Sequence, residues 1–205
     1  SVSTWIKPDT YTDWMAILGK AWWDSGYKNS CFTLKTNNEN KFNFMLFPTA
    51  TESGVMNLYS GAYTTGHWYH LALVFDSGTA FRMYVNGNQV DSDTSSVPAS
   101  CYNNNYPLSI GIETNGAGSY SSAYFDGIVD EVLIFDEAIS ADKVKALYEN
   151  KSHILVSEET NIGDNISTCV TPNDGIEDGT EVCSVNLTVL EANNVPSLTL
   201  SLKPT

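Results

Sequence analysis

Hydrophobic and polar positions alternate along much of this chain, and the alternation predicts β-strands. Residues 68–75 are apolar at nearly every position, which is typical of a strand buried on both faces. After a turn, residues 81–85 alternate between apolar side chains and Arg82 or Tyr84, which predicts a half-buried strand. The Asn-Gly pair at 86–87 then predicts a two-residue hairpin turn, because both residue types tolerate positive φ.

A further strand is predicted after the Asp126-Gly127 turn, alternating as far as Phe135, and a short helix follows it. Ser140 is expected as its N-cap, with an acidic residue in the first turn. Val144, Leu147 and Tyr148 are three and four positions apart, so they share one helical face that can dock onto a sheet. Because the surrounding sequence predicts strands and turns, we expect a β-domain that is closed by one helix.

Three motifs, in this order, carry a resemblance to a known family. They are Trp5-Ile6-Lys7-Pro8, the pair of strands from Trp68 to Asn86-Gly87, and Asp126-Gly127 with Asp130-Glu131-Val132 and the predicted helix. Over residues 1–150 they resemble the laminin-G-like group of the concanavalin A-like lectin/glucanase superfamily. The resemblance implies an all-β fold, a two-sheet antiparallel jelly-roll sandwich with one short C-terminal helix. This fold carries many activities, so it does not by itself assign one.

Composition changes after Asn150. Residues 151–205 hold 8 acidic and 2 basic residues and no Trp, Tyr or Phe. Residues 1–150 hold 16 acidic and 8 basic residues and every Trp, Tyr and Phe of the chain. The run from Gly163 to Val189 resembles the later strands of immunoglobulin- or cadherin-like modules of microbial surface proteins. We therefore expect a laminin-G-like domain at 1–150, a partial immunoglobulin-like β-segment at 151–192, and a linker with the start of a further strand at 193–205.

The resemblance also implies a further strand ahead of Ser1. We therefore expect Ser1–Lys7 to leave an unpaired sheet edge, as Leu198–Leu202 would at the other end of the chain. Such edges invite strand addition, either from the rest of a longer polypeptide or from another subunit.

Charge and cysteine usage narrow the function classes. The formal net charge is −14 and Arg82 is the one arginine, which argues against nucleic acid as a partner. No apolar run reaches the roughly 20 residues that span a bilayer. Four separated cysteines without zinc-ligand spacing favour two disulfides over free thiols. Pairing within each segment, Cys31–Cys101 and Cys169–Cys183, is the economical choice, and the other two connectivities stay open.

Three Asn-x-Ser/Thr sequons begin at Asn150, Asn165 and Asn186. Together with the predicted disulfides they indicate an extracellular or cell-surface protein.

Catalytic chemistry is not indicated. Asp130 and Glu131 are adjacent, so on a strand they point to opposite faces. They therefore cannot flank one glycosidic bond at the roughly 5–9 Å that two-carboxylate hydrolysis requires. The resemblance instead implies a structural Ca²⁺ at Asp130, held with backbone carbonyls, which would suit the six to eight oxygens that Ca²⁺ prefers. The alternative is that Asp130 caps the backbone locally or pairs with a lysine.

Aromatic and amide side chains in loops are the candidates for sugar binding, since rings stack on sugar C–H faces and amides bond hydroxyls. Trp22, Trp23 and Tyr27 form one such group, for which contact with a protein or simple packing are the alternatives. Asn103 and Tyr106 form another. Trp5, Trp14 and Trp68 are expected in the core or at its rim.

These observations favour a non-catalytic extracellular recognition or adhesion module that binds carbohydrate, or a cell-surface protein, through its loops. One alternative is a structural subunit of a surface layer or filament, assembled by strand addition at unpaired edges. Another is an accessory domain of a glycan-degrading enzyme.

Overall fold

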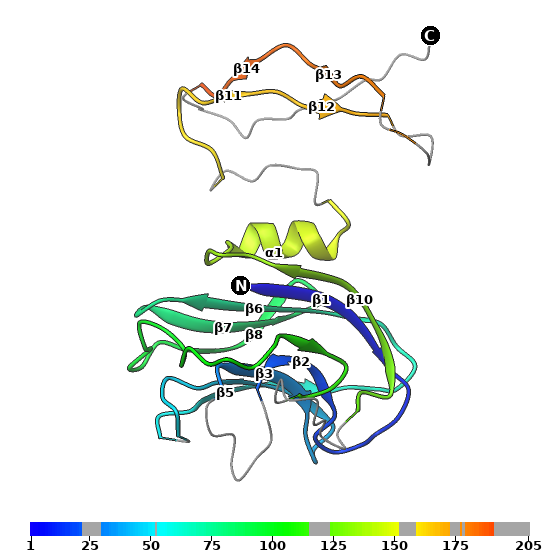
Figure 1. The fold of residues 1–205 in the computed structure, drawn as a ribbon, viewed down its shortest axis with the longest axis vertical. Helices are drawn as coiled ribbons and strands as arrows, with labels where there is room; N and C mark the ends of the chain where they lie inside the picture. The colour runs from blue at the N-terminus through cyan, green and yellow to red at the C-terminus, as the bar shows by residue number, and fades with distance from the viewer. Residues whose placement is uncertain are drawn as a thin grey trace. The chain divides into compact units, whose positions relative to one another are not determined.

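Two compact units, Ser1–Ile154 and Leu155–Thr205, make up the computed structural model of the chain (Figure 1). The structure describes residues 1–21, 30–51, 53–114, 124–151, 159–172, 177 and 179–190. The first unit contains β1 (Val2–Pro8), β2 (Ala16–Lys20), β3 (Phe32–Thr36), β4 (Lys41–Leu46), β5 (Met56–Ala62), β6 (Tyr69–Asp76), β7 (Ala80–Val85), β8 (Asn88–Asp93), β9 (Ser109–Ile110), β10 (Gly127–Ile134) and α1 (Ala141–Tyr148).

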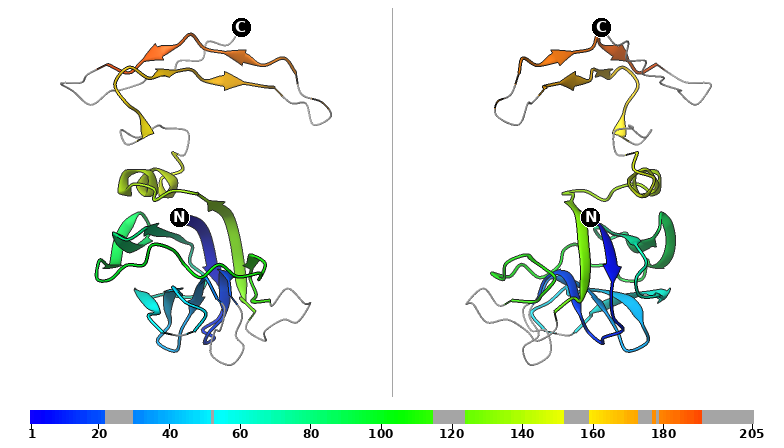
Figure 2. Two further views of the ribbon diagram at one scale, coloured as in Figure 1. Left: turned by 60° about the vertical axis from the view of Figure 1, so that its left-hand side comes forward. Right: turned by 90° about the vertical axis from the view of Figure 1, so that its right-hand side faces the viewer.

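The first unit is a sandwich of two five-stranded sheets. One has the strand order β10-β1-β6-β7-β8 and the other β5-β4-β3-β2-β9, and neighbouring strands within each are antiparallel. Figure 2 shows the two sheets facing each other and α1 on the outer side of the sheet that contains β1. The predicted all-β jelly-roll sandwich with one short helix is confirmed.

The main core lies between the sheets, where both contribute apolar side chains from alternate positions. Ile6, Leu73 and Phe81 come from one sheet, and Leu34 and Phe44 come from the other. Fully burying an aliphatic or aromatic side chain contributes roughly 1.5–3 kcal/mol. This layer therefore supplies most of the stabilisation of the first unit.

A second, smaller core lies under the helix and confirms the predicted docking face. Val144 and Leu147 pack on Ala72, Val74 and Tyr84 of the sheet. The Ser140 side chain accepts a hydrogen bond from the backbone N–H of Lys143 at 3.1 Å, so it caps the helix as predicted.

The expectation that β7 is half-buried is wrong. Tyr84, one of the two residues expected on its outer face, is buried because α1 covers that side of the sheet. Strand β6, predicted from the run 68–75, is buried on both faces from His70 to Val74.

The edge expected at Ser1–Lys7 is also not found. β1 lies inside its sheet, paired with β6 on one side and β10 on the other, so its backbone groups are already used. Within the described residues, β10 and β8 are the strands that end this sheet. Leu198–Leu202 lies outside the described residues.

The second unit contains two short antiparallel ladders. β11 (Asn165–Ile166) pairs with β14 (Leu187–Thr188), and β12 (Cys169–Val170) pairs with β13 (Val182–Cys183). Val170 and Val182, which face each other, are 61% and 68% exposed. These short ladders do not show an immunoglobulin-like sandwich, and that part of the expectation stays a prediction.

Both disulfides follow the economical pairing. Cys31 is joined to Cys101, and Cys169 to Cys183. The second bridge links directly opposed residues of β12 and β13. Since an isolated two-stranded hairpin is marginally stable in water, this covalent link is a main stabilising element of the second unit.

Candidate ligand-binding site

A hollow of about 320 Å³ lies on the loop that follows Cys101. It is lined by Tyr102, Asn103, Asn104, Asn105 and Tyr106. Asn103 and Asn105 are exposed, whereas the two tyrosines are half-buried. The lining therefore combines aromatic rings with amide groups that can both donate and accept hydrogen bonds. The predicted ligand residues Asn103 and Tyr106 are brought together in this one hollow.

The loop is fixed to the sandwich at three points. The Cys31–Cys101 disulfide holds its start, and the Tyr102 N–H donates to the Phe47 carbonyl at 2.7 Å. The buried Asn104 amide donates to the Lys20 carbonyl at 3.1 Å, and its oxygen accepts from the Tyr106 N–H at 2.9 Å. A loop held in this way loses little conformational entropy on binding a ligand.

Trp22, Trp23 and Tyr27 lie outside the described residues. The chain on either side of them is placed, because the Cys31 N–H donates to the Lys20 carbonyl at 2.9 Å. The same carbonyl accepts from Asn104. The described residues Lys20 and Cys31, on either side of this segment in the sequence, therefore lie beside the hollow.

Asp130, the predicted calcium ligand, lies on β10 opposite Trp5. Its side chain is exposed, and Oδ1 accepts a hydrogen bond from the Glu131 N–H at 2.8 Å. This is the local cap that the alternative interpretation expected, and it leaves the second oxygen for a cation. One carboxylate oxygen is a small part of the six to eight that Ca²⁺ prefers, so calcium at Asp130 stays a prediction.

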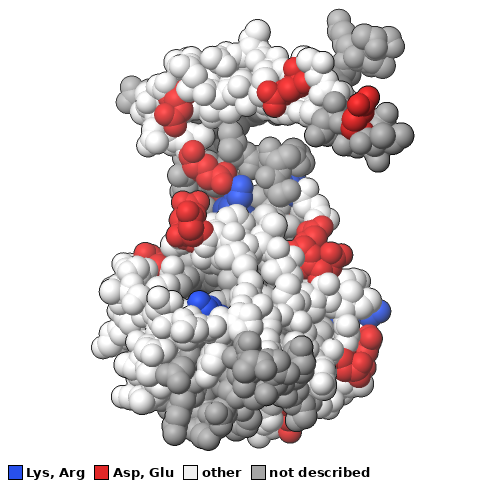
Figure 3. All heavy atoms as spheres, in the orientation of Figure 1, with Lys and Arg blue, Asp and Glu red and all other residues white. Residues whose placement is uncertain are grey.

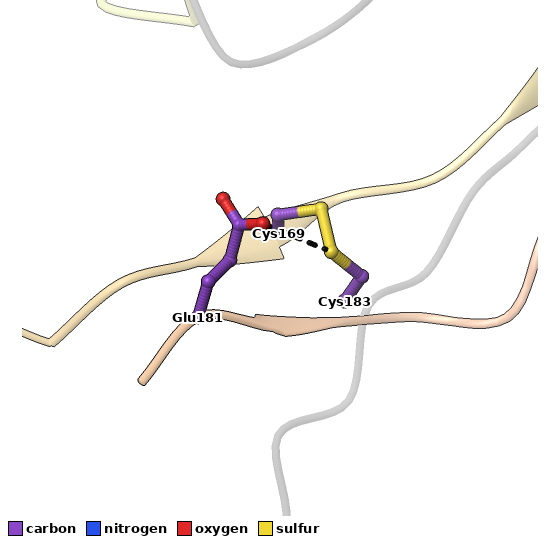
Figure 4. Close-up of side chains that lie close together, drawn as sticks. All are labelled: Cys169, Glu181 and Cys183. Carbon is purple, nitrogen blue, oxygen red and sulfur yellow. Dashed lines mark hydrogen bonds between the residues drawn. A yellow bond between two sulfur atoms is a disulfide. The ribbon is translucent and has the colours of Figure 1, made fainter. Parts of the chain in front are cut away.

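Cys169, Glu181 and Cys183 gather on the second unit, where Figure 4 shows the glutamate beside the two sulfurs. A Glu181 oxygen lies 3.7 Å from the Cys183 sulfur. Both sulfurs are joined in the disulfide, and a metal-binding cysteine must be a free thiolate. This cluster is therefore not a metal site.

Two tryptophans expected in the core or at its rim are prominent on the surface. Trp14 is 47% exposed in the turn before β2, and Trp68 is 43% exposed just before β6. Trp5 is half-buried and stacks on Tyr148 of α1, with ring centroids 5.7 Å apart. A spacing pattern could not separate these three environments, because each is set by contacts between distant parts of the chain.

Charged side chains on the visible surface are mostly acidic (Figure 3). One lysine is an exception to the usual exposure of cations. Lys35 of β3 is buried, and its Nζ lies 4.6 Å from the centroid of the Trp14 ring. Burial lowers the pKa of Lys35 to about 8, while the nearby Glu113 carboxylate opposes that change. Lys35 is therefore mostly charged at neutral pH.

Comparison of the solved structures with this fold finds sugar-binding proteins among the similar chains. The chain resembles a native heptameric SAP-like pentraxin from Limulus polyphemus, with 19% identity and a TM-score of 0.54 over 72% of this chain and 68% of that one. It also resembles domain 4 of AbnA, an extracellular arabinanase from Geobacillus stearothermophilus solved with arabinotriose, with 22% identity and a TM-score of 0.51 over 72% and 65%.

A further similar structure is the CBM40 of the Ruminococcus gnavus IT-sialidase, bound to alpha2,6 sialyllactose. Identity is 15% and the TM-score is 0.54, over 72% of this chain and 81% of that one. At these identities the likeness shows the fold alone.

No curated protein matches the chain significantly. A family model, Laminin_G_3, described as the concanavalin A-like lectin/glucanases superfamily, matches residues 1–145. The chain therefore belongs to this superfamily.

Proposed function

We propose that this chain is a non-catalytic module that binds carbohydrate outside the cell through the loop from Tyr102 to Tyr106. The observation that carries the proposal is the hollow itself. Two half-buried tyrosines and two exposed asparagines line it, on a loop that a disulfide and three hydrogen bonds hold in place. Rigid aromatic faces beside amide groups are what a sugar ring with its hydroxyls requires.

Two further observations support the proposal. The arabinanase domain and the sialidase CBM40 are similar in fold to this chain, and their structures were solved with arabinotriose and alpha2,6 sialyllactose. Both disulfides suit an oxidising compartment, which agrees with an extracellular or cell-surface location. No helix among the described residues is long and apolar enough to span a membrane.

The accessory role is compatible with this binding function. The similar arabinanase domain and sialidase CBM40 are both parts of enzymes. A module of this kind would keep a separate catalytic domain near its glycan by raising the effective local concentration. Even in an accessory role, the function that we propose for this chain is carbohydrate binding.

A second candidate, assembly by strand addition, is favoured by one observation. Among the described strands, β10 ends its sheet and carries Ile128, Leu133 and Ile134 at 40–56% exposure. An open edge with apolar side chains is a template for pairing with another chain. Light scattering between 1 and 100 µM tests it, because assembly predicts a mass that rises with concentration and falls in an Ile134→Lys variant.

The binding function is tested on a broad glycan array with the purified chain, in millimolar calcium and again in chelator. We expect a reproducible hit that Tyr106→Ala weakens at least tenfold, which corresponds to about 1.4 kcal/mol. Tyr59→Ala, at an exposed tyrosine of β5, serves as the matched control and should bind as the wild type. A blank array from folded protein would refute the proposal.

The double variant Trp22→Ala/Trp23→Ala tests the remaining predicted ligand residues. If those rings contact the glycan, binding is lost while the melting temperature stays nearly unchanged. A large drop in melting temperature would instead show that the rings belong to the core.

A further inference from the structure

Trp14 has a backbone conformation that bulky residues rarely adopt. Its φ is +62°, in the left-handed region, where the side chain of an L-residue crowds its own backbone. Such a conformation costs roughly 1–2 kcal/mol and persists only where the surrounding structure imposes it. The residue is also 47% exposed, so burial of the ring does not explain why the strain is kept.

Thr36 of β3 fixes the turn on both sides of Trp14. Its buried hydroxyl donates to the Thr12 carbonyl at 2.7 Å and accepts from the Met15 N–H at 3.0 Å. The Thr36 N–H also donates to the Met15 carbonyl at 3.0 Å. One residue of the sheet therefore sets the backbone before and after the tryptophan.

The ammonium group of Lys35 lies against one face of the Trp14 ring. Lys35 Nζ lies 4.6 Å from the ring centroid, within the range of a cation–π contact, and the rest of the lysine is buried. With one face of the indole against the ammonium group, the exposed part of the side chain is directed toward solvent. The ring is thus presented in a fixed orientation.

An aromatic residue, Tyr11, and an acidic residue, Asp13, lie just before Trp14 in the chain. Tyr11 is 52% exposed and stacks on Tyr63, with ring centroids 5.6 Å apart. Tyr63 in turn stacks on Phe42 of the core at 4.8 Å, so the pair is anchored. The carboxylate of Asp13 is exposed and lies close enough to help raise the pKa of Tyr63, after the larger effect of burial.

We propose that Trp14 is the stacking platform of a second carbohydrate site, and that Tyr11 and Asp13 supply polar contacts to the sugar hydroxyls. The inference rests on the proposed function and extends it to a new position. Trp14 precedes the start of β2 at Ala16, whereas the hollow is attached at the end of β2 at Lys20. Four residues of strand correspond to about 13 Å, so the two sites are separate.

The chemistry of the site favours a neutral pyranose. A flat, exposed indole matches the C–H face of a pyranose ring, and Asp13 can accept hydrogen bonds from its hydroxyls. A carboxylated sugar would meet this carboxylate on a chain of net charge −14. The nearby cation, Lys35, lies against the indole and is buried. The site therefore differs in preference from the sialyllactose-bound CBM40.

Trp14→Asn is the decisive variant, because asparagine tolerates the left-handed conformation and the substitution therefore removes the ring without adding backbone strain. The probe is an array of matched glycan pairs, each neutral or capped with sialic acid. We expect the wild type to bind neutral members, and Trp14→Asn to lose at least tenfold in affinity without a fall in melting temperature. Trp68→Ala removes an equally exposed tryptophan elsewhere and should leave binding unchanged.

The outcomes separate this inference from the proposed function. If Trp14→Asn binds every glycan as the wild type does, the Trp14 site is refuted and the hollow remains. If the wild type binds no glycan, the proposed function fails and the inference fails with it. Binding confined to the sialylated members would refute the assignment of a neutral ligand.

A chemical measurement covers the case in which Trp14→Asn does not fold. N-bromosuccinimide oxidises accessible indoles, and mass spectrometry of peptides locates each oxidised tryptophan. Bound neutral glycan should protect Trp14 and leave Trp68 reactive. Equal oxidation of Trp14 with and without saturating glycan would overturn the proposal.

Thr36 is a positioning residue in this scheme, and its role has its own test. Thr36→Val removes the hydroxyl and should weaken neutral-glycan binding several-fold in the fully folded fraction, because the indole is no longer held. Thr36→Ser restores the hydroxyl and should restore the affinity. Equal affinities for the folded valine and serine variants would show that the hydroxyl serves stability alone.

Discussion

Acidification should weaken the first unit through His70. This imidazole is 1% exposed beneath α1, where Nε2 and the Ser3 hydroxyl form a hydrogen bond of 2.8 Å. Its Nδ1 has no hydrogen-bond partner among the described residues. The rings of Trp5 and Tyr148 lie 5.3 and 6.0 Å from it. Burial among these groups disfavours the charged form and lowers the pKa of His70 from 6.5 to about 4.

The sign and size of the effect follow from linkage. The unfolded chain takes up a proton at this histidine below about pH 6.5, whereas the folded chain does so only near pH 4. Stability from the neutral imidazole is therefore intact above pH 6.5 and is lost as the pH falls toward 4. At pH 5 the folded site binds only about a tenth of a proton, so the free energy of unfolding falls by about 2 kcal/mol relative to pH 7. For a domain of this size that corresponds to about 4–8 °C in melting temperature.

The assay is urea denaturation of the wild type and His70→Gln at several pH values between 7 and 5. Because the many carboxylates titrate in both proteins, the difference between the two curves isolates His70. We expect that difference to change by about 2 kcal/mol across this range. His67→Gln, at an exposed histidine, should follow the wild type. Parallel curves for the wild type and His70→Gln, or a His70 pKa near 6.5 by NMR, would refute the reasoning.

Three further predictions concern the backbone at Gly127, the Cys31–Cys101 disulfide and calcium binding at Asp130. Gly127→Ala should cost several kcal/mol in urea denaturation, because a Cβ there would overlap the Lys7 carbonyl oxygen. Gly61→Ala meets nothing within 4 Å and should be tolerated. Replacing Cys31 and Cys101 by serine opens a loop of 70 residues and should cost about 4 kcal/mol, with weakened glycan binding at the hollow; an unchanged denaturation midpoint would contradict this. If Asp130 forms a weak calcium site with a Kd near 1 mM, 10 mM Ca²⁺ should add about 1.4 kcal/mol to stability, seen as a thermal shift that Asp130→Asn abolishes.

Local patterns predicted the elements of the fold well. The helix, its Ser140 cap and its docking face were visible in the sequence because they depend on residues three or four positions apart. The strand β6 was visible because burial on both faces leaves a continuous apolar run. These signals lie within one element, so a single sequence contains them.

Contacts between distant segments escaped prediction. Tyr84 was predicted to face outward, because nothing near it in the sequence indicates that α1 covers it. The central position of β1 depends on β10, whose pairing residues are far along the chain. Likewise, the backbone conformation of Trp14 is set by the Thr36 hydroxyl on β3, a contact that the local sequence does not indicate. Asn103 and Tyr106, which line the hollow, could be proposed as ligand residues only from their chemistry.

The position of β1 has a consequence for how the first unit is made. In the pairing of β1 with β10, Val2 lies opposite Ile134, so two partners of one ladder are 132 positions apart in the chain. At a synthesis rate of roughly 5–20 residues per second, β10 is made about 7–26 s after β1. During that interval the backbone groups on the side of β1 that faces β10 stay open to other nascent chains. Ordering so distant a pair also slows folding. β1 is thus enclosed late relative to its own synthesis, and we expect protection of nascent chains during synthesis to affect the yield of this protein.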